Sequence, residues 1–458
     1  MTSSIPNLRT KLKDTTSRCP ICHELCAATV WKTDSTPSKV YLTRKCPEHG
    51  EASMCISSDA RFYWMAKGNE QNSCCGGSAC SAAAEGLDGT LGKNAYAPKG
   101  ETVETLSTCL ALIEIVDSCN LACPTCFAAS PPGINKQLDY HSLDNIQSRI
   151  NGVLDRKKNI EILQLSGGEP TLHPDFFELL DWIHERKQID YTLVNTNGVL
   201  IAKDDEFLKK LGQRARRGNF QLYLQFDGTG PAAQKALRGG DLRQMKKRVM
   251  ERCKEEEIPV TLAMTVTPQN LEELWSTIQF GLDYDNCRGV SFQPMFWSGR
   301  LPEAISPQKL NPEAIRLNAA DIIIGCVEQS EGKVKYEDFT PLPCGDPNCA
   351  TIGYLLKTPI GVKSISDFID FSTVQDFLKD KVRYELADLQ QCGCENTALG
   401  EILHQFEMEE KNTFRLFIKP FMDSWTWDED RIDRCCTHVI RPDGKLDSFC
   451  RYYHSGIS

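Results

Sequence analysis

The sequence has no long hydrophobic run, no excess of basic residues and no low-complexity tract. Its longest apolar stretches, such as 110–115 and 322–324, stop far short of the about 18 residues that a membrane-spanning helix needs. The net charge is −10 and the basic run 214–217 is short, which argues against a nucleic-acid partner. Because the first residues also lack the apolar core of a secretory signal, we expect a cytoplasmic protein without a transmembrane segment.

Cysteine, in contrast, is abundant, with 22 in a chain of 458 residues. Disulfide frameworks belong to small secreted domains, whereas this chain is long enough for two or three domains and carries no export signal. Many of the cysteines also stand in short-spaced groups beside proline, glycine or histidine. The pattern therefore favours metal centres over disulfides.

One cysteine group has three members and no fourth. Cys119, Cys123 and Cys126, in the stretch CNLACPTCF, directly follow the apolar run 110–116. A structural zinc or a four-thiolate cluster closes its metal with four ligands, so three thiolates leave one position open to another molecule. The spacing therefore predicts a four-iron cluster with one reactive iron.

The first 70 residues contain two short motifs that are typical of metal binding. CPIC supplies Cys19 and Cys22, and CPEHG supplies Cys46 and His49. Tight turns of this kind point backbone amides at the sulfurs, so we expect a pair of knuckles around one mononuclear iron or zinc. Cys26 is an alternative fourth ligand, and two turns that bind no metal are the other interpretation.

Further cysteines lie on both sides of the central region. On the N-terminal side, we expect an auxiliary cluster whose ligands are Cys74, Cys75, Cys80 and Cys109. The alternative is that the adjacent pair of cysteines is only partly used as ligands. Beyond residue 330, the Pro- and Gly-flanked cysteines favour a second module folded around metal, drawn from Cys344, Cys349, Cys392, Cys394, Cys435, Cys436 and Cys450. Of these segments, QCGC is equally well explained as an ordinary turn. Three single cysteines are expected to be small buried hydrophobes: Cys253, Cys287 and Cys326.

The central region alternates between short strand-like runs and amphipathic stretches, which predicts a parallel sheet covered by helices. Helices are expected at 174–186 and 271–284, among others. Six strands are expected, at 111–116, 160–165, 191–195, 221–226, 260–266 and 290–294. The predicted fold class is α/β, a partial (β/α)6 barrel of the TIM type. The expected domains are a metal-knuckle domain at 1–70, a Cys/Gly-rich linker at 71–105, the barrel at 106–330 and a C-terminal cluster domain at 331–458.

The candidate functional groups follow successive strands. The three cysteines come after the first strand, SGGEP (166–170) after the second, NTNG (195–198) after the third and QFDG (225–228) after the fourth. The carboxyl ends of barrel strands meet at one face, where reactive groups gather. Tight turns also favour glycine and asparagine, but four such ends in register make that explanation less adequate.

The three spaced cysteines, the aromatic Phe127 after them and the downstream GGEP together resemble the radical S-adenosylmethionine superfamily. The resemblance implies that Cys119, Cys123 and Cys126 bind a [4Fe–4S] cluster, whose fourth iron is chelated by S-adenosylmethionine. Reduction of the cluster would cleave S-adenosylmethionine to methionine and a 5′-deoxyadenosyl radical. An electron donor of the flavodoxin or ferredoxin type is therefore an expected partner.

The same resemblance implies residues that bind S-adenosylmethionine. Gly167 and Gly168 would let the backbone approach the ligand, and Glu169 would accept from its cationic amino group. Arg238 would pair with the methionine carboxylate, with an exposed helical face as the alternative. The full expected set is Phe127, near the adenine, with Gly167, Gly168, Glu169, Asn195, Asn197, Gln225 and Arg238.

Features along nearly the whole chain narrow the resemblance to the tetraether lipid synthase group, once described as pterin methylases. They are CPIC and CPEHG, the cysteines before the first strand, FQPMFWSGR, PCGDPNC and the final CTHVIRPDGKLDSFCRYY. Members carry a rubredoxin-like knuckle, a radical core and auxiliary iron–sulfur clusters. By analogy, a C-terminal auxiliary cluster would use Cys344, Cys349, Cys450 and Cys436, with Cys435 in place of Cys436 as the alternative.

The expected function is hydrogen abstraction from an unactivated C–H bond followed by C–C bond formation, with a lipid chain as the candidate substrate. Within the same chemistry, the alternatives are a methyltransferase acting on a pterin-like small molecule and a peptide maturase. A non-catalytic iron–sulfur or zinc-binding protein is the alternative from another class. The expected cofactors are a [4Fe–4S] cluster with S-adenosylmethionine, one or two auxiliary [4Fe–4S] clusters, and mononuclear iron or zinc.

Overall fold

The computed structural model describes residues 9–64, 108–132, 137–302, 315–342, 345–368 and 412–455. Several sequence-based predictions lie outside the described residues, namely those on Cys74, Cys75, Cys80, Cys344, Cys392 and Cys394. Within the described ranges, no helix is both long enough and apolar enough to cross a membrane.

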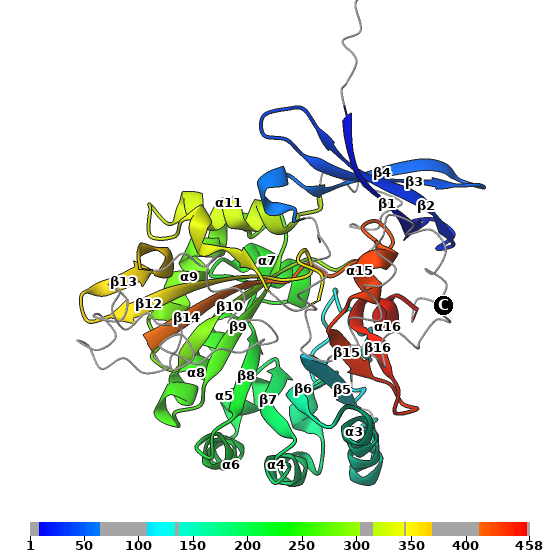
Figure 1. Ribbon diagram of the computed structural model, residues 1–458. Coiled ribbons are helices and arrows are strands. Elements are labelled where there is room, and N and C mark those ends of the chain that lie inside the picture. The colour runs from blue at the N-terminus through cyan, green and yellow to red at the C-terminus, as the bar shows by residue number, and fades with distance from the viewer. Residues whose placement is uncertain are drawn as a thin grey trace, which may run out of the picture.

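The N-terminal residues form a four-stranded antiparallel sheet, drawn in blue at the top of Figure 1. Its small core contains Val30, Val40 and Leu42, all fully buried. Such residues fall on one face of the sheet because successive side chains of a strand point to opposite sides. The elements are β1 (Arg9–Arg18), β2 (Leu25–Thr33), β3 (Val40–Cys46), β4 (Gly50–Ser57) and the 3-10 helix η1 (Ala60–Phe62).

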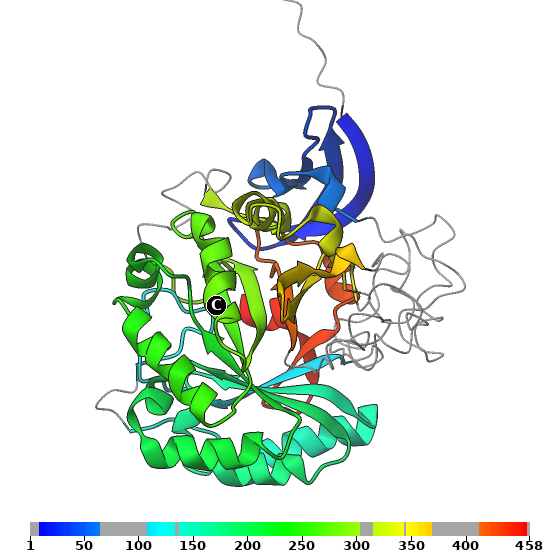
Figure 2. The ribbon, with the colours of Figure 1, turned by 90° about the vertical axis from the view of Figure 1, so that its left-hand side faces the viewer.

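A second, larger sheet contains six parallel strands that are neighbours in chain order. They are β5 (Leu110–Val116), β6 (Ile160–Gly167), β7 (Ile189–Thr196), β8 (Phe220–Gln225), β9 (Val260–Val266) and β10 (Cys287–Pro294). Figure 2 shows the sheet curving around an interior. The six predicted strands and the α/β class of an open, barrel-like parallel sheet are therefore confirmed.

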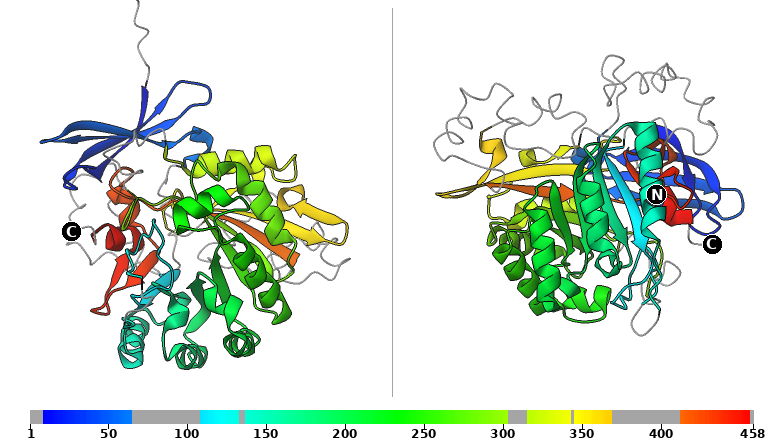
Figure 3. Two further views of the ribbon diagram at one scale, coloured as in Figure 1. Left: turned by 180° about the vertical axis from the view of Figure 1, so that it is seen from behind. Right: turned by 90° about the horizontal axis from the view of Figure 1, so that it is seen from below.

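Helices cover the outer side of this sheet (Figure 3). Their inward faces are apolar, as in the buried Ile150, Val153, Leu179 and Ile183, which join the main hydrophobic core. The helices are α3 (Leu143–Lys157), α4 (Phe176–His184), α5 (Val199–Lys203), α6 (Asp205–Ala215), α7 (Pro231–Arg238), α8 (Arg243–Glu255), α9 (Leu274–Leu282) and α11 (Ala319–Gln329), with the 3-10 turns η2 (Pro170–Leu172) and η3 (Leu271–Glu273). The predicted helices at 174–186 and 271–284 correspond to α4 and to η3 with α9.

The chain beyond residue 330 adds strands to both edges of the same sheet. The added elements are η5 (Tyr336–Asp338), β11 (Thr340–Pro341), β12 (Thr351–Thr358), β13 (Gly361–Ser364), η6 (Ile365–Asp367), β14 (Thr413–Ile418), α15 (Glu429–Asp433), β15 (Thr437–Ile440), β16 (Leu446–Ser448) and α16 (Phe449–Ser455). β14 pairs in parallel with β10, and β15 pairs in parallel with β5. In the described part of the chain these strands extend the core sheet, and the division into a core and a C-terminal cluster domain stays a prediction.

Candidate active site

The three cysteines of CNLACPTCF lie in the loop that follows β5. The Leu121 N–H donates to Cys119 Sγ at 3.4 Å, and Arg300 Nε donates to the Cys123 carbonyl at 2.9 Å. Arg300 also exchanges two backbone hydrogen bonds with Cys126, at 2.8 and 2.9 Å. The segment after β10 therefore holds the cysteine loop, a role that the sequence did not reveal.

The thiols of this loop influence one another. Burial raises the pKa of Cys119 to about 12, and the charges of Glu169, Cys123 and Cys126 act in the same direction. A thiol that ionises so reluctantly is a weak nucleophile, whereas coordination to a metal deprotonates it outright. Cys119 is therefore a poor nucleophile by itself, and a bound metal would have to deprotonate it.

The two glycines of SGGEP are required by contacts within the chain. A Cβ on Gly167, whose φ is +122°, would lie 2.1 Å from the Val116 carbonyl oxygen, and a Cβ on Gly168 would lie 2.1 Å from that of Ser118. The Gly168 N–H donates to the Val116 carbonyl at 2.7 Å, and the Glu169 N–H to the Ser118 carbonyl at 3.1 Å. SGGEP is thus fastened to the start of the cysteine loop, a reason for its glycines that differs from ligand approach.

Glu169 is buried and joins the ends of β6 and β7. Its carboxylate accepts from Thr171 Oγ1 at 2.6 Å, from Thr196 Oγ1 at 2.7 Å and from the Asn197 N–H at 2.7 Å. Burial raises the pKa of this carboxyl group, and the donors from Asn197, Thr171 and Thr196 oppose that rise. Glu169 therefore has a structural task at this site, and its contact with S-adenosylmethionine stays a prediction.

The asparagines of NTNG reach neighbouring motifs. Asn197 Nδ2 donates to Asn120 Oδ1 at 2.7 Å and lies 3.8 Å from Cys119 Sγ. Asn195 Nδ2 donates to Ser166 Oγ at 3.0 Å. The ends of the second and third core strands are thereby linked to the cysteine loop, as the predicted register of strand ends requires.

Lys246 is a site residue that sequence reasoning missed. It is fully buried, and its Nζ donates to the Asn197 carbonyl at 2.7 Å and to Gln225 Oε1 at 3.2 Å. Burial lowers the pKa of Lys246 to about 7. Lys246 lies on the inner face of α8, three residues before the buried Val249. This helical spacing is the sequence signal that could have predicted that Lys246 is buried.

Arg238 is paired inside the protein. Its Nε and Nη2 donate to the two carboxylate oxygens of Asp227 at 2.6 and 3.0 Å, and Asp227 is fully buried. Although burial works against the charge, Asp227 raises the pKa of Arg238 above its usual range. The alternative of an exposed helical face is therefore wrong, and a contact with the methionine carboxylate stays a prediction.

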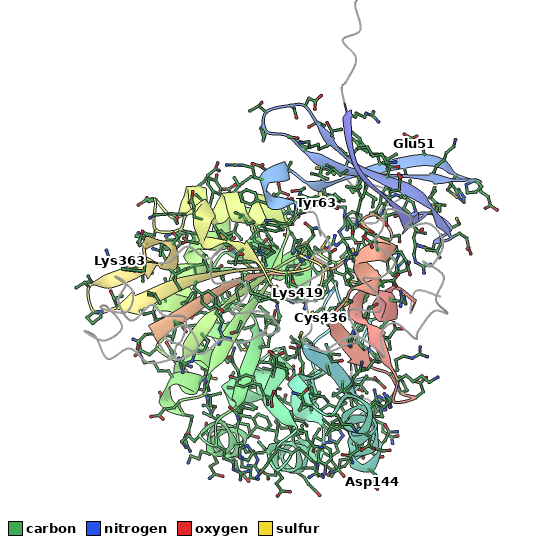
Figure 4. The ribbon with its side chains drawn as sticks, viewed as in Figure 1. Glu51, Tyr63, Asp144, Lys363, Lys419 and Cys436 are labelled. Atoms are coloured by element: carbon green, nitrogen blue, oxygen red, sulfur yellow. The ribbon has the colours of Figure 1, made fainter. Side chains whose placement is uncertain are left out.

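One cavity of about 340 Å³ lies inside the curved sheet and joins the two cysteine-rich regions. Its wall includes Phe127, whose ring stands edge-on to that of Tyr453 in α16 at 4.8 Å between centroids. Figure 4 shows Lys419 and Cys436, also part of the wall, toward the middle of the molecule. The cysteines that line the cavity are Cys119, Cys123, Cys126, Cys349, Cys435, Cys436 and Cys450.

The C-terminal cysteines of the cavity wall receive N–H groups. The Met422 N–H donates to Cys450 Sγ at 3.3 Å, and Arg431 Nη2 donates to Cys349 Sγ at 3.6 Å. Burial raises the pKa of Cys435 to about 11, and the charge of Cys349 acts in the same direction. Buried thiols with N–H donors aimed at sulfur fit an iron–sulfur cluster.

Two of the predicted auxiliary ligands have further contacts. Cys436 Sγ lies 3.2 Å from the position of a Cβ on Gly345, so a larger residue would crowd the thiol. The Cys436 carbonyl accepts from the Cys109 N–H at 3.1 Å, which brings the N-terminal and C-terminal cysteine groups together. Cys109 itself is disulfide-bonded, so its ligand role stays a prediction. The three single cysteines predicted to be buried are indeed fully buried: Cys253, Cys287 and Cys326.

Most of the cavity wall is apolar, but amide and hydroxyl side chains gather on several core strands and form a polar interior that the sequence reading did not anticipate. Gln164 donates to Asn195, and Gln293 Nε2 donates to Tyr223 Oη at 2.8 Å. The amide and hydroxyl residues that line it are Gln164, Ser166, Asn195, Gln221, Gln225, Thr261, Thr265, Ser291 and Gln293. A typical barrel interior is filled by branched apolar side chains. Polar residues at every second position of several core strands are therefore the sequence signal that could have predicted this polar interior.

The N-terminal sheet brings together the two knuckle motifs. One ligand atom from each of four residues lies within 4.8 Å of the others: Cys19, Cys22, Cys46 and His49. Cys26 is buried beside the cysteines but is not one of these four. Three thiolates and an imidazole form a usual donor set for structural zinc.

Two parts of the chain match known protein families. Residues 113–281 match the radical SAM superfamily, and residues 11–58 match the HMPTM N-terminal zinc ribbon domain. Residues 113–281 therefore carry a radical SAM core, and the chain is a radical SAM enzyme, which supports a [4Fe–4S] cluster and S-adenosylmethionine as cofactors. At the N-terminal site, the zinc ribbon match and the four ligands suggest zinc.

The individual relatives differ in how much of the chain they cover. The 7,8-dihydro-6-hydroxymethylpterin dimethyltransferase of Methanocaldococcus jannaschii is 26% identical over 96% of this chain and 93% of its own length. The PqqA peptide cyclase of Bradyrhizobium diazoefficiens is 29% identical over 40% of this chain and 46% of its own length. The crystal structure of Streptococcus suis SuiB bound to precursor peptide SuiA aligns with a TM-score of 0.35 and 18% identity over 42% of this chain and 40% of that chain, which is too low for a conclusion.

Proposed function

We propose that this enzyme transfers methyl groups to a C–H position of a pterin-like heterocycle. The relative named for a pterin dimethyltransferase is similar over 96% of this chain, flanking regions included, whereas the peptide cyclase is similar over 40%. Regions outside the shared core are where radical enzymes of different substrates diverge, so the longer similarity has more weight. C–C bond formation on a lipid, the first expectation from the sequence, has no such support among these relatives.

The similarity over 96% of the chain carries the proposal, and the amide and hydroxyl side chains that form a polar interior within a mostly apolar wall agree with it. A pterin presents amide and amine groups along its edge, and glutamine side chains pair with donors and acceptors alike. Gln225 Nε2 is buried in the wall without a hydrogen-bond partner among the described residues. An unpaired buried amide costs roughly 1–3 kcal/mol, and a bound molecule with hydrogen-bonding groups, either S-adenosylmethionine or a heterocyclic substrate, would remove that cost.

The protein's part in the reaction is to hold and shield its reactants. Bound S-adenosylmethionine and the reduced cluster supply a 5′-deoxyadenosyl radical, which takes a hydrogen atom from the substrate. The chain would place the target carbon close to the cysteine loop, inside the cavity, and keep water from it. The predicted S-adenosylmethionine ligands line the same cavity: Phe127, Gly167, Gly168, Glu169, Asn195, Asn197, Gln225 and Arg238.

We also propose that the C-terminal cysteines of the cavity wall hold an auxiliary [4Fe–4S] cluster. Cys349, Cys435 and Cys450 are all buried or half-buried, and the thiols of Cys349 and Cys435 both raise the pKa of Cys450. A cluster there would face the same cavity as the radical centre, close enough to exchange an electron with a substrate. A flavodoxin- or ferredoxin-type protein is the proposed source of the electron that starts the reaction.

Product analysis tests this proposal. The full chain is reconstituted anaerobically with iron and sulfide, reduced, and incubated with S-adenosylmethionine and either 7,8-dihydro-6-hydroxymethylpterin, a diether lipid or a peptide. We expect 5′-deoxyadenosine and a pterin carrying one or two new methyl groups. S-adenosylhomocysteine in the mixture would identify S-adenosylmethionine as the methyl donor, whereas a folate-type donor leaves no such product. A cross-linked lipid with an unchanged pterin would overturn the proposal.

Gln293→Leu is the matched variant for the polar interior. Leucine has similar volume but no amide, so we expect the KM for the pterin to rise about threefold to tenfold, the effect of one hydrogen bond. Cleavage of S-adenosylmethionine without substrate should be unchanged, because Gln293 is not among its predicted ligands. Equal KM values for the pterin in Gln293→Leu and the wild type would show that the polar interior does not contribute to pterin binding.

A further inference from the structure

The zinc ribbon sheet, β1–β4, contacts the C-terminal segment that surrounds the auxiliary cysteines. In Figure 1 it lies directly above α15 and α16. Lys13 of β1 forms ion pairs with Asp428 and Asp430, each at 2.7 Å, and Thr15 Oγ1 donates to Asp428 Oδ1 at 2.6 Å. Asp428 is the N-cap residue, directly before the first residue of α15, so these contacts join β1 to the start of this helix.

The charges in this contact are largely removed from solvent. Only 18% of the Lys13 side chain and 2% of the Asp428 side chain are exposed. Burial works against the charge of Lys13, but Asp428 and Asp430 overcome it and raise its pKa. A buried pair of this kind is costly to break from one side, because the remaining charge is left without a partner.

The metal-binding end of the ribbon makes a second contact with the same segment. Arg44, two residues before Cys46, is almost fully buried and donates to the Ser424 and Trp425 carbonyls, each at 2.6 Å. His23, the residue after Cys22, has its Nδ1 3.0 Å from Ser424 Oγ. Arg44 lies in β3 two residues before one metal-ligand candidate, and His23 directly follows another, so both contacts lie next to the predicted metal site.

The middle of α15 contributes Arg431 to the cavity wall. Arg431 Nη2 donates to Cys349 Sγ at 3.6 Å and to the Asn348 carbonyl at 2.8 Å, and the guanidinium lies against the buried carboxylate of Asp346. Asn348 in turn exchanges two hydrogen bonds with the backbone of Trp64, at 2.6 and 2.9 Å. The chain that leaves the ribbon therefore also holds the loop that carries Cys349.

We propose that Arg431 is a positioning residue of the auxiliary centre and that the zinc ribbon keeps it in place. Hydrogen bonds to the sulfurs of an iron–sulfur cluster and nearby positive charge stabilise the more negative, reduced state, which raises its reduction potential. The inference rests on the proposed auxiliary cluster. The zinc ribbon would thus act away from its own metal site. It would hold α15 in position and thereby maintain the contact between Arg431 and Cys349.

The first test measures the reduction potential of the auxiliary cluster, by EPR-monitored titration of the anaerobically reconstituted full chain. We expect Arg431→Met to lower this potential and Arg431→Lys, which keeps the charge, to restore part of it. Arg217→Met, in the turn after α6, is the matched control and should leave the potential unchanged, because Arg217 pairs with Asp181. An Arg431→Met protein with the wild-type potential would overturn the assignment of Arg431.

The second test addresses the ribbon. Lys13→Met should keep its zinc and lower the auxiliary potential in the same direction, by less than Arg431→Met. Cys22→Ser should lose the zinc and the wild-type auxiliary EPR signal while the cysteine loop still cleaves S-adenosylmethionine. Wild-type auxiliary spectra and potential in zinc-free Cys22→Ser would overturn the role of the ribbon.

The outcome is separate from that of the methyltransferase proposal. If no pterin is methylated but a second cluster is present and responds to Arg431→Met, the inference stands and only the substrate is wrong. If the wild-type chain binds iron for the radical cluster alone, the inference fails together with the auxiliary centre.

Discussion

The two groups of cysteines on the cavity wall are assembled in different ways. Cys119, Cys123 and Cys126 come from one loop after β5, held by SGGEP and by Arg300. Cys349, Cys435 and Cys450 come from the loop before β12, from the segment between α15 and β15, and from α16. A local loop needs only its two neighbouring strand ends, whereas the second group forms only after distant segments have joined the sheet. The radical centre should therefore survive damage that destroys the auxiliary one.

The largest expected effect is that of Cys123→Ala. Removing one of three ligands leaves the cluster without a defined open iron, so we expect 5′-deoxyadenosine formation to fall to background. The measurement is chromatography of the products after anaerobic reconstitution and reduction. Cys253→Ala is the control, since Cys253 is buried in α8 away from both groups and its loss should cost stability only, about 1 kcal/mol. Cleavage at the wild-type rate in Cys123→Ala would contradict the assignment of the first group.

Cys349→Ala should separate the two groups. We expect loss of about four irons per chain, since one auxiliary cluster is no longer held. Product formation should fall to background while part of the S-adenosylmethionine cleavage remains, because the cysteine loop has none of its contacts altered. Iron analysis and product quantification check both parts. Unchanged iron content and product yield would show that Cys349 is not a ligand.

The same contrast explains what could be read from the sequence. Spacing alone identified the first group, because its three residues share one loop and the strand pattern around them is regular. The knuckle motifs were equally local, and the structure brings Cys19, Cys22, Cys46 and His49 within reach of one metal. The six core strands were found because each is a short apolar run between helices.

The auxiliary region could not be derived in this way. β12 and β14 are separated in sequence by the segment 369–411, yet they pair with each other and extend the core sheet. Nothing in their local pattern says which edge they join. Lys246 and Arg431 were missed for the same reason: each is a charged residue whose role depends on a partner that is distant in sequence. Asp227 lies in the predicted QFDG motif, but its pairing with Arg238 could not be read from the sequence.

Gly168→Ala tests the support of the cysteine loop. The new methyl group would lie 2.1 Å from the Ser118 carbonyl oxygen, so SGGEP must move away from the loop. Because misplacement by about 1 Å can cost about 100-fold in rate, we expect S-adenosylmethionine cleavage to fall by that order. The auxiliary EPR signal should persist. Gly240→Ala is the matched control, since a Cβ there meets nothing within 4 Å. Equal rates in the two variants would show that the close approach is not needed.

The smallest expected effect is the contribution of Lys246 to the pH dependence of the free energy of unfolding. Lys246 lies near the first group of cysteines, at the ends of β7 and β8. Its pKa in the folded chain is lowered to about 7 by burial, against an ordinary value of 10.5. Between these values the unfolded chain binds a proton that the folded chain does not, so the free energy of unfolding should rise with pH from about 7 to 10.5. The contribution of one such group is at most about 1.4 kcal/mol per pH unit.

Lys246→Met removes this contribution, and urea unfolding at pH 7.5 and 9.5 measures it. We expect the wild type to gain more stability than the variant between these two pH values, because other titrating groups are common to both proteins. The auxiliary potential should respond equally to pH in the two proteins, since Lys246 contacts the ends of β7 and β8 and not the C-terminal cysteines. Parallel pH profiles of stability would show that Lys246 remains charged in the folded chain, with its proton held by the carbonyl of Asn197 and the charge of Asp227.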